Sequence, residues 1–85
     1  MNEKTFDLNI ITPEKAVYSG KVVSLVAPSE DGYMGVLADH AALLASMAGG
    51  KITAREPSVK AVAVDTPAGG FMEVKKNVVT ILLPA

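Results

Sequence analysis

The stretch DHAALLASMAGG, residues 39–50, decides the fold class of this 85-residue chain. Asp39 is a good N-cap residue, helix-forming alanines and leucines follow it, and a Gly-Gly pair ends the run. Local rules therefore predict a short helix. An isolated helix of this length is only marginally stable in water, and packing against strands would make the same residues extended. Local propensity leaves helix and strand both open.

The residues before this stretch predict β-strands. Phe6, Leu8 and Ile10 alternate with polar residues, which is the period of a strand with one buried face. The segment 18–28 opens with a Ser-Gly turn and carries apolar side chains on both faces, as a strand between two layers does. A PSEDG loop follows, and YMGVL at 33–37 predicts another strand.

The residues after this stretch predict four more strands, at 49–55, 59–66, 70–74 and 77–83. Turn residues separate each strand from the next, and short strands at this spacing are typical of an all-β sandwich or barrel. Four glycines are expected to supply positive φ angles in turns and bulges along the chain, namely Gly32, Gly35, Gly49 and Gly50.

The composition predicts one globular domain over residues 1–85, with 49% hydrophobic and 20% charged residues. A net charge of −1 lacks the basic footprint of a nucleic-acid binder. The absence of cysteine excludes disulfides and thiolate zinc sites. The acidic N-terminus is not a signal peptide, and no apolar run approaches the ~20 residues of a membrane-spanning helix.

His40 is the only histidine, and it invites an acid–base interpretation because Asp39 precedes it. Neighbours along a strand point to opposite faces, so Asp39 would not orient the ring. Nothing marks Ser24 or Ser46 as a nucleophile, and zinc requires three or four ligands. We therefore expect no catalytic, metal or cofactor-binding residues, with a small hydrolase that uses His40 as the alternative.

The hairpin around Lys75 and Lys76 suggests another class, the lipoyl and biotinyl carrier domains, which present a modified lysine at a hairpin tip. In those domains the lysine is flanked by Met, or by Asp and Ala. Here the two lysines are flanked by Val74 and Asn77, which match that motif poorly. A free-standing carrier or adaptor domain remains an open alternative, and an adduct mass on either lysine would identify it.

The segment 33–44 is rich in large apolar residues, and glycines precede and interrupt it. They cannot all be buried in so small a core, which favours a protein-binding surface. The residues are Tyr33, Met34, Val36, Leu37, Leu43 and Leu44.

Two long stretches resemble one family in order. LNIITPEKAVYSGKVVSLVAPSEDGYMGVLADHAALLASMAGGKI at 8–52 and GGFMEVKKNVVTILLPA at 69–85 resemble the epsilon subunit of bacterial F-type ATP synthases, called delta in mitochondria. The resemblance implies an all-β fold, a flattened β-sandwich of about ten short, mostly antiparallel strands. It also implies that 41–47 is a strand.

The resemblance implies a non-catalytic subunit at the foot of the central stalk, which contacts the gamma subunit and the c-ring and helps couple rotation to ATP synthesis. The ion would be a proton or sodium. The chain would be peripheral on the cytoplasmic side of the bacterial plasma membrane, without membrane insertion or nucleic acid.

Two sets of residues carry these contacts in the resemblance. The c-ring set is Glu30, Asp31, Gly32, Tyr33, Met34 and Gly35. The gamma set is His40, Ala41, Ala42, Leu43 and Leu44. Relatives often place an acid where Tyr33 stands, so Glu30 or Asp31 is expected to provide the negative charge.

Three further departures concern the turn and the end of the chain. Relatives usually have Pro-Gly where this chain has Ala38-Asp39, and proline where it has Ala42. They usually continue into a helical hairpin that inhibits ATPase activity and, in some members, binds ATP. For these 85 residues we expect no C-terminal helical domain and no nucleotide binding.

Overall fold

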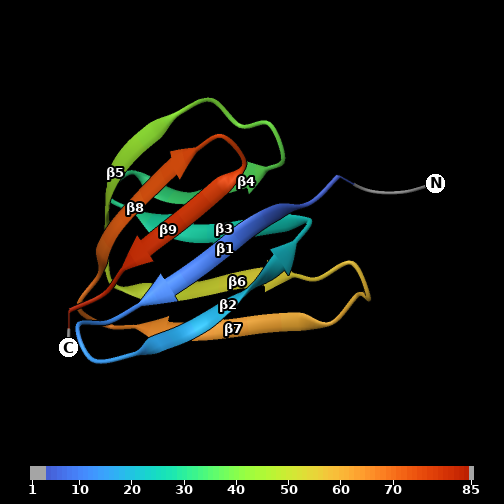
Figure 1. Cartoon of the computed structure of the whole chain (residues 1–85). Coiled ribbons are helices and arrows are strands. Elements are labelled where there is room, and N and C mark those ends of the chain that lie inside the picture. The colour runs from blue at the N-terminus through green and yellow to red at the C-terminus, as the bar shows by residue number, and fades with distance from the viewer. Residues whose placement is uncertain (1–3, 85) are drawn as a thin grey trace.

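Two β-sheets packed face to face make up the molecule (Figure 1). The computed structural model describes residues 4–84, and strands are the only regular elements in that range. The nine strands are β1 (Phe6–Ile11), β2 (Ala16–Val22), β3 (Ser24–Ser29), β4 (Gly32–Leu37), β5 (Leu43–Met47), β6 (Gly50–Arg55), β7 (Ala61–Thr66), β8 (Gly70–Lys75) and β9 (Val78–Leu82).

One sheet has the order β2-β1-β9-β8-β5, and the other has the order β4-β3-β6-β7. We call them the five-stranded and the four-stranded sheet. Neighbouring strands run antiparallel except β1 and β9, which are parallel. The predicted all-β, mostly antiparallel sandwich is confirmed, with nine strands in the described residues where about ten were expected.

The stretch that decides the fold class contains a strand. β5 pairs with β8, with Leu43 opposite Val74 and Met47 opposite Gly70. Met47 is buried whereas Leu44 is 74% exposed, which is the alternation of a strand with one covered face. Pairing with β8 satisfies the backbone groups on one edge of β5 and buries its inner face, so tertiary context overrides the local helix signal.

The segment 18–28 is two strands in different sheets, so its prediction as one strand is wrong. The chain crosses between the layers at Val23, whose side chain is buried and whose backbone N–H donates to Arg55 O at 2.8 Å. Ser19 and Gly20, predicted as a turn, lie inside β2. β2 completes an edge of the five-stranded sheet, and β3 lies within the four-stranded one.

The core lies between the two inner sheet faces and consists of aliphatic side chains. β1 shows why, since Phe6, Leu8 and Ile10 are all at most 2% exposed and the residues between them are half-buried. Each such side chain stabilises the fold by about 1.5–3 kcal/mol when fully buried. The largest fully buried side chains are Leu8, Ile10, Leu25, Ile52, Met72, Ile81, Val22, Val36 and Val79.

Candidate partner-binding surfaces

The predicted c-ring residues, 30–35, form the β3–β4 turn and the first part of β4; we call them the candidate turn. Ser29 and Gly32 pair across the hairpin, so Glu30 and Asp31 are its two tip residues, and both are exposed. Ser29 Oγ donates to Gly32 O and accepts from Asp31 N at 3.3 Å. The turn therefore presents two carboxylates on a hydrogen-bonded tip.

Tyr33 and Met34 point to opposite faces of β4. Tyr33 is 64% exposed and lies toward β6, because a Cβ added at Gly50 would come within 3.0 Å of its Oη. Met34 is half-buried and packs against the core, so Tyr33 is the more exposed of the two side chains. Strand alternation is the reason, since only every second residue of β4 can face outward. Tyr33 is therefore the exposed aromatic side chain of the candidate turn.

The glycines of this region differ in their roles. Gly32 has φ of 113°, as predicted, and it closes the turn. Gly35 is not among the positive-φ residues and lies within β4, so the prediction for it is wrong. A Cβ added at Gly35 would meet only Leu25 O, at 4.0 Å, which is ordinary contact. Gly49 and Gly50 also lack positive φ; Gly49 is required because an added Cβ would lie 2.3 Å from Pro67 O.

The predicted gamma residues, 40–44, follow β4 and enter β5; we call them the candidate segment. Ala41 and Ala42 are exposed, and Leu44 is 74% exposed on the outer face of β5. Leu43 is half-buried and packs against the core, which anchors the segment. The segment therefore offers small side chains and one exposed leucine.

Asp39, immediately before the candidate segment, connects it to the β8–β9 turn. Its backbone N–H donates to Asn77 Oδ1 at 2.6 Å, and Asn77 Nδ2 donates to Asp39 Oδ1 at 3.0 Å. Lys4 Nζ lies 2.9 Å from the other oxygen, Oδ2. The hydrogen bond from Asn77, and then the contact with Lys4, lower the pKa of the Asp39 carboxyl below its ordinary value.

His40 makes local contacts. Its ring Nδ1 lies 2.8 Å from Ala41 O, and its backbone N–H donates to Leu37 O at 3.3 Å. The Asp39 carboxylate is directed to Asn77 and Lys4, as the preceding contacts show. Within residues 4–84, no three His, Asp or Glu side chains come together as metal ligands. The arrangement therefore gives His40 no partner in acid–base chemistry among the contacts described.

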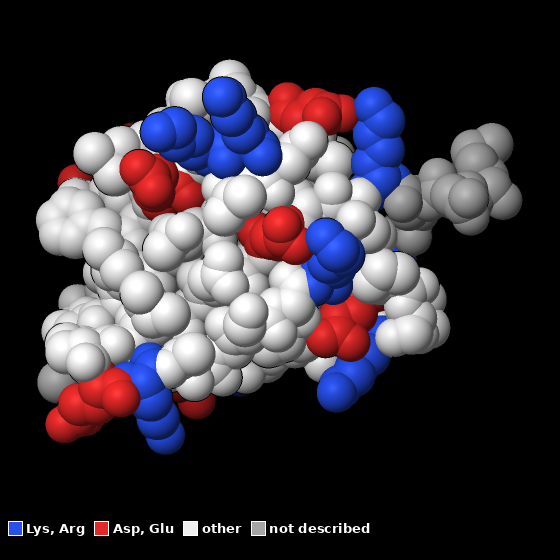
Figure 2. Space-filling view, viewed as in Figure 1, with Lys and Arg blue, Asp and Glu red and all other residues white. Residues whose placement is uncertain are grey.

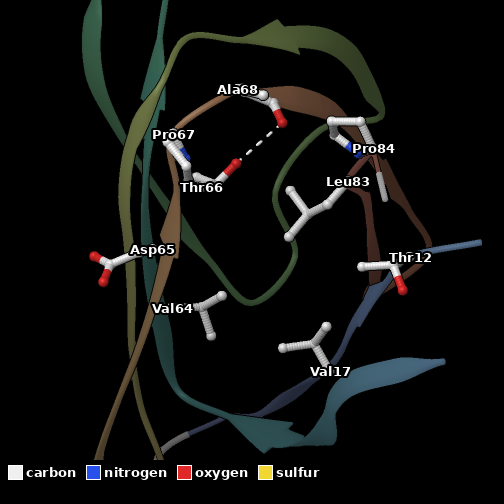
Figure 3. Close-up of a pocket in the computed structure, with 10 residues that line it drawn as sticks. Thr12, Val17, Val64, Asp65, Thr66, Pro67, Ala68, Leu83 and Pro84 are labelled. Atoms are coloured by element: carbon white, nitrogen blue, oxygen red, sulfur yellow. Dashed lines mark hydrogen bonds between the residues drawn. The ribbon is translucent and has the colours of Figure 1, made fainter. Parts of the chain in front are cut away.

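A hollow of about 260 Å³ lies between β7, the β7–β8 turn and Leu83 (Figure 3). Val17, Val64 and Leu83 point into it, and Asp65 points away. The hydroxyl groups of its lining are engaged in their own turns: Thr66 donates to Gly69 O at 3.0 Å, and Thr12 donates to Lys15 O at 3.2 Å. Its walls are therefore mainly apolar, without a cluster of convergent polar groups to orient a small molecule.

Sequence reasoning missed an apolar row on the outer face of the five-stranded sheet. Phe71 pairs with Leu82, and Leu82 pairs with Ile11, so the three side chains lie side by side across β8, β9 and β1. Phe71 is 56% exposed and Leu82 is 49% exposed. Figure 2 shows this face, with uncharged side chains between groups of charged ones. The sequence contains a signal for this row. Phe71, Glu73 and Lys75 alternate along β8 and so lie on the same face, and the two charged residues indicate that this face is exposed.

A family model described as "ATP synthase, Delta/Epsilon chain, beta-sandwich domain" matches residues 5–85. The ATP synthase epsilon chain of Pelotomaculum thermopropionicum is 42% identical over 85 residues, which are 100% of this chain and 62% of that protein. The epsilon chain of Leptospira borgpetersenii is 42% identical over 77 residues, covering 89% of this chain and 58% of the relative. The chain thus spans about three fifths of these relatives.

A shorter relative is matched almost throughout. The epsilon chain of Chlorobaculum tepidum is 40% identical over 83 residues, which are 95% of this chain and 91% of that protein. Among solved structures, a chain of the Euglena gracilis mitochondrial ATP synthase OSCP/F1/c-ring assembly aligns with a TM-score of 0.87 at 22% identity, over 98% of this chain and 52% of its own length. That likeness shows a shared fold. On the family match, the chain belongs to the ATP synthase delta/epsilon β-sandwich domain family.

Proposed function

We propose that this chain is the sandwich of a non-catalytic central-stalk subunit in a proton- or sodium-driven F-type ATP synthase. The family match over residues 5–85 is the observation that carries the proposal. Two proteins of similar fold come from solved ATP synthase assemblies that include a c-ring, one of them the central stalk and c-ring of Tetrahymena thermophila. In this proposal the subunit links gamma to the c-ring on the cytoplasmic side of the bacterial plasma membrane.

The geometry of β4 supports a linking role. The tip of the candidate turn precedes β4 and the candidate segment follows it, so the two lie at opposite ends of one strand. Five residue steps from Gly32 to Leu37 separate them by about 17 Å, at 3.3 Å a residue. β4 pairs with β3 throughout its length, which holds this separation fixed. A rigid spacer is what transmission of torque between two partners requires.

The chemistry of each end suits a different partner. The candidate turn presents the Glu30 and Asp31 carboxylates with Tyr33 beside them, which suits polar loops with basic side chains. The candidate segment presents Leu44 and small residues, which suits close packing against another protein. We therefore assign the c-ring to the turn and gamma to the segment. Contact with the membrane is indirect in this proposal, and no helix within residues 4–84 is long and apolar enough to cross one.

Two double variants test the assignment. His40→Ala with Leu44→Ser changes the candidate segment, and Glu30→Lys with Asp31→Lys reverses the charge of the turn. We expect the first pair to weaken binding to purified gamma about tenfold or more, measured by calorimetry, because the few residues that dominate an interface each cost more than about 1 kcal/mol when truncated and about 1.4 kcal/mol is tenfold. We expect the second pair to leave gamma binding unchanged but to reduce ion pumping per ATP hydrolysed in the reconstituted synthase.

Lys60→Glu is the control, since Lys60 is exposed in the β6–β7 loop and belongs to neither candidate set. It should leave gamma binding and pumping unchanged. A wild-type chain that does not bind gamma would refute the proposal. Loss of gamma binding in the turn variant, with binding intact in the segment variant, would reverse the assignment. An intact mass with a lipoyl or biotinyl adduct would support the carrier alternative instead.

A further inference from the structure

The contact between Asp39 and Asn77 is reciprocal. Asp39 donates its backbone N–H to the Asn77 side-chain oxygen, and Asn77 donates its side-chain amide to the Asp39 carboxylate. The two residues are 38 positions apart, and they come from turns that leave different sheets, β4 in one and β8 in the other. The pair therefore ties the connection between the sheets to the β8–β9 turn.

The Asn77 side of this contact is rigidly mounted. Lys76 and Asn77 have φ of 51° and 60°, the left-handed pair that a tight two-residue hairpin turn requires. The backbone O of Asn77 accepts a hydrogen bond from Asp7 N at 3.0 Å, which fixes the turn to β1. The amide of Asn77 is thus presented from the middle of the five-stranded sheet, not from a loose loop.

The Asp39 side is held at the residue that sets the direction of the candidate segment. Asp39 itself has φ of 64°, a conformation that non-glycine residues rarely adopt without local hydrogen bonds. Lys4 Nζ contacts the second carboxylate oxygen at 2.9 Å, so both oxygens are engaged. His40 follows directly, and its backbone N–H turns back to Leu37 O. The backbone at Asp39 therefore determines how the following residues leave the sheet.

We propose that Asp39 and Asn77 are positioning residues, which order the candidate segment for gamma by clamping it to the β8–β9 turn. The role in gamma binding rests on the function proposed above. Neither residue needs to touch gamma, because the pair acts through the backbone of residues 40–44. Lys4 supports the clamp from outside, where solvent screens its charge.

The backbone geometry offers unusually clean variants. Asn77→Gly and Asp39→Gly each remove a clamp side chain, and glycine accepts the positive φ at both positions without strain. Lys76→Gly is the matched control, since it makes the same change in the same turn at a residue outside the clamp. Thermal melts of the three variants establish that each is folded.

The first readout is independent of any partner. We expect both clamp variants to raise the picosecond–nanosecond mobility of backbone amides 40–44, with ¹⁵N order parameters falling from about 0.85 toward 0.6. The Lys76→Gly control should leave these order parameters as in the wild type. Unchanged order parameters in both clamp variants would overturn the proposal, whatever happens with gamma.

The second readout is affinity for purified gamma. Each clamp variant should weaken binding about threefold to tenfold, the double variant should bind no more weakly than the weaker single variant, and Lys76→Gly should bind normally. Additive losses, or unchanged affinity in both single variants while the wild type binds, would overturn the positioning role. A wild-type chain that does not bind gamma would refute the proposed function, and the order parameters would still decide whether the clamp exists.

Discussion

The hydrogen bond between Tyr18 and Glu56 connects the two sheets at one side of the sandwich. Tyr18 lies in β2, in the five-stranded sheet, and its phenol donates to Glu56 Oε2 at 2.6 Å. Glu56 begins the loop after β6, in the four-stranded sheet. Tyr18→Phe removes this hydrogen bond and keeps the ring, which packs against the core. We predict that this single oxygen atom contributes measurably to the stability of the domain.

The expected magnitude follows from the charge of the acceptor. A hydrogen bond to a charged group contributes about 1.5–3 kcal/mol, but the pair is only partly buried, so we expect Tyr18→Phe to cost about 1–2 kcal/mol. A domain of 85 residues has a total stability of about 4–13 kcal/mol. The substitution should therefore lower the melting temperature by about 4–16 °C.

The same pair predicts a dependence on pH. Desolvation first, and then the hydrogen bond to Glu56, raise the pKa of Tyr18 to about 12. An unfolded tyrosine has a pKa of about 10, so folding favours the protonated phenol. This contribution is fully present below pH 10 and is lost as the pH rises toward 12. The difference in unfolding free energy between the wild type and Tyr18→Phe should shrink over that range.

Urea denaturation at pH 8, 10 and 11.5 measures both effects. Tyr33→Phe is the control, since that ring is 64% exposed and its substitution should change stability by less than about 0.5 kcal/mol. A cost below about 0.5 kcal/mol for Tyr18→Phe at pH 8 would show that the hydrogen bond does not stabilise the domain as predicted. A difference from the wild type that stays constant up to pH 11.5 would contradict the predicted link to the Tyr18 pKa.

Three further predictions concern the backbone and the clamp. Gly49→Ala should destabilise the domain by about 1–3 kcal/mol in urea, because the added Cβ would lie 2.3 Å from Pro67 O, whereas Gly35→Ala should change stability by less than about 0.5 kcal/mol; equal effects would contradict this. Val59→Gly should raise stability by about 1 kcal/mol, since a β-branched residue with φ of 60° is strained in the β6–β7 loop, and a lower melting temperature would argue against strain. Folding lowers the pKa of the Asp39 carboxyl below 3.8, so the ionised carboxylate stabilises the clamp above pH 3.8, and this stabilisation is lost as the pH falls through the lower pKa of the folded state. Measurements of ¹⁵N relaxation should therefore show that the candidate segment of the wild type becomes more mobile below about pH 4. Asp39→Gly lacks the carboxylate, so its segment should show no further increase.

Strand phase made much of the fold predictable. The alternation of Phe6, Leu8 and Ile10 identified the inner face of β1, and the turn residues separated β6, β7, β8 and β9 correctly. The division of 18–28 between two sheets was not predictable in this way. Val23 continues the apolar run, and nothing in its side chain indicates that its N–H will donate to Arg55 O instead of continuing the ladder within one sheet.

Periodicity also left the decisive stretch undecided, because alanine and leucine suit a helix as well as a strand. What makes it a strand is its pairing with β8, whose residues lie 23 (Met47 to Gly70) to 31 (Leu43 to Val74) positions later in the chain. The resemblance supplied the correct choice because it carries information about the whole fold. Local propensity carries none about a partner so distant in sequence.

The candidate residues divide in the same way. Their location in a turn and a following segment was predictable, yet Met34 and Leu43 pack against the core, so each set offers fewer contact residues than its sequence suggests. The clamp could not be predicted from the sequence, because Asp39 and Asn77 are 38 residues apart and neither belongs to a known motif. The clamp also explains a departure from the family pattern. With φ of 64°, position 39 suits the glycine that the resemblance leads one to expect there. This chain can place aspartate in that conformation because the Asn77 side chain accepts a hydrogen bond from the Asp39 backbone N–H and donates one to its carboxylate.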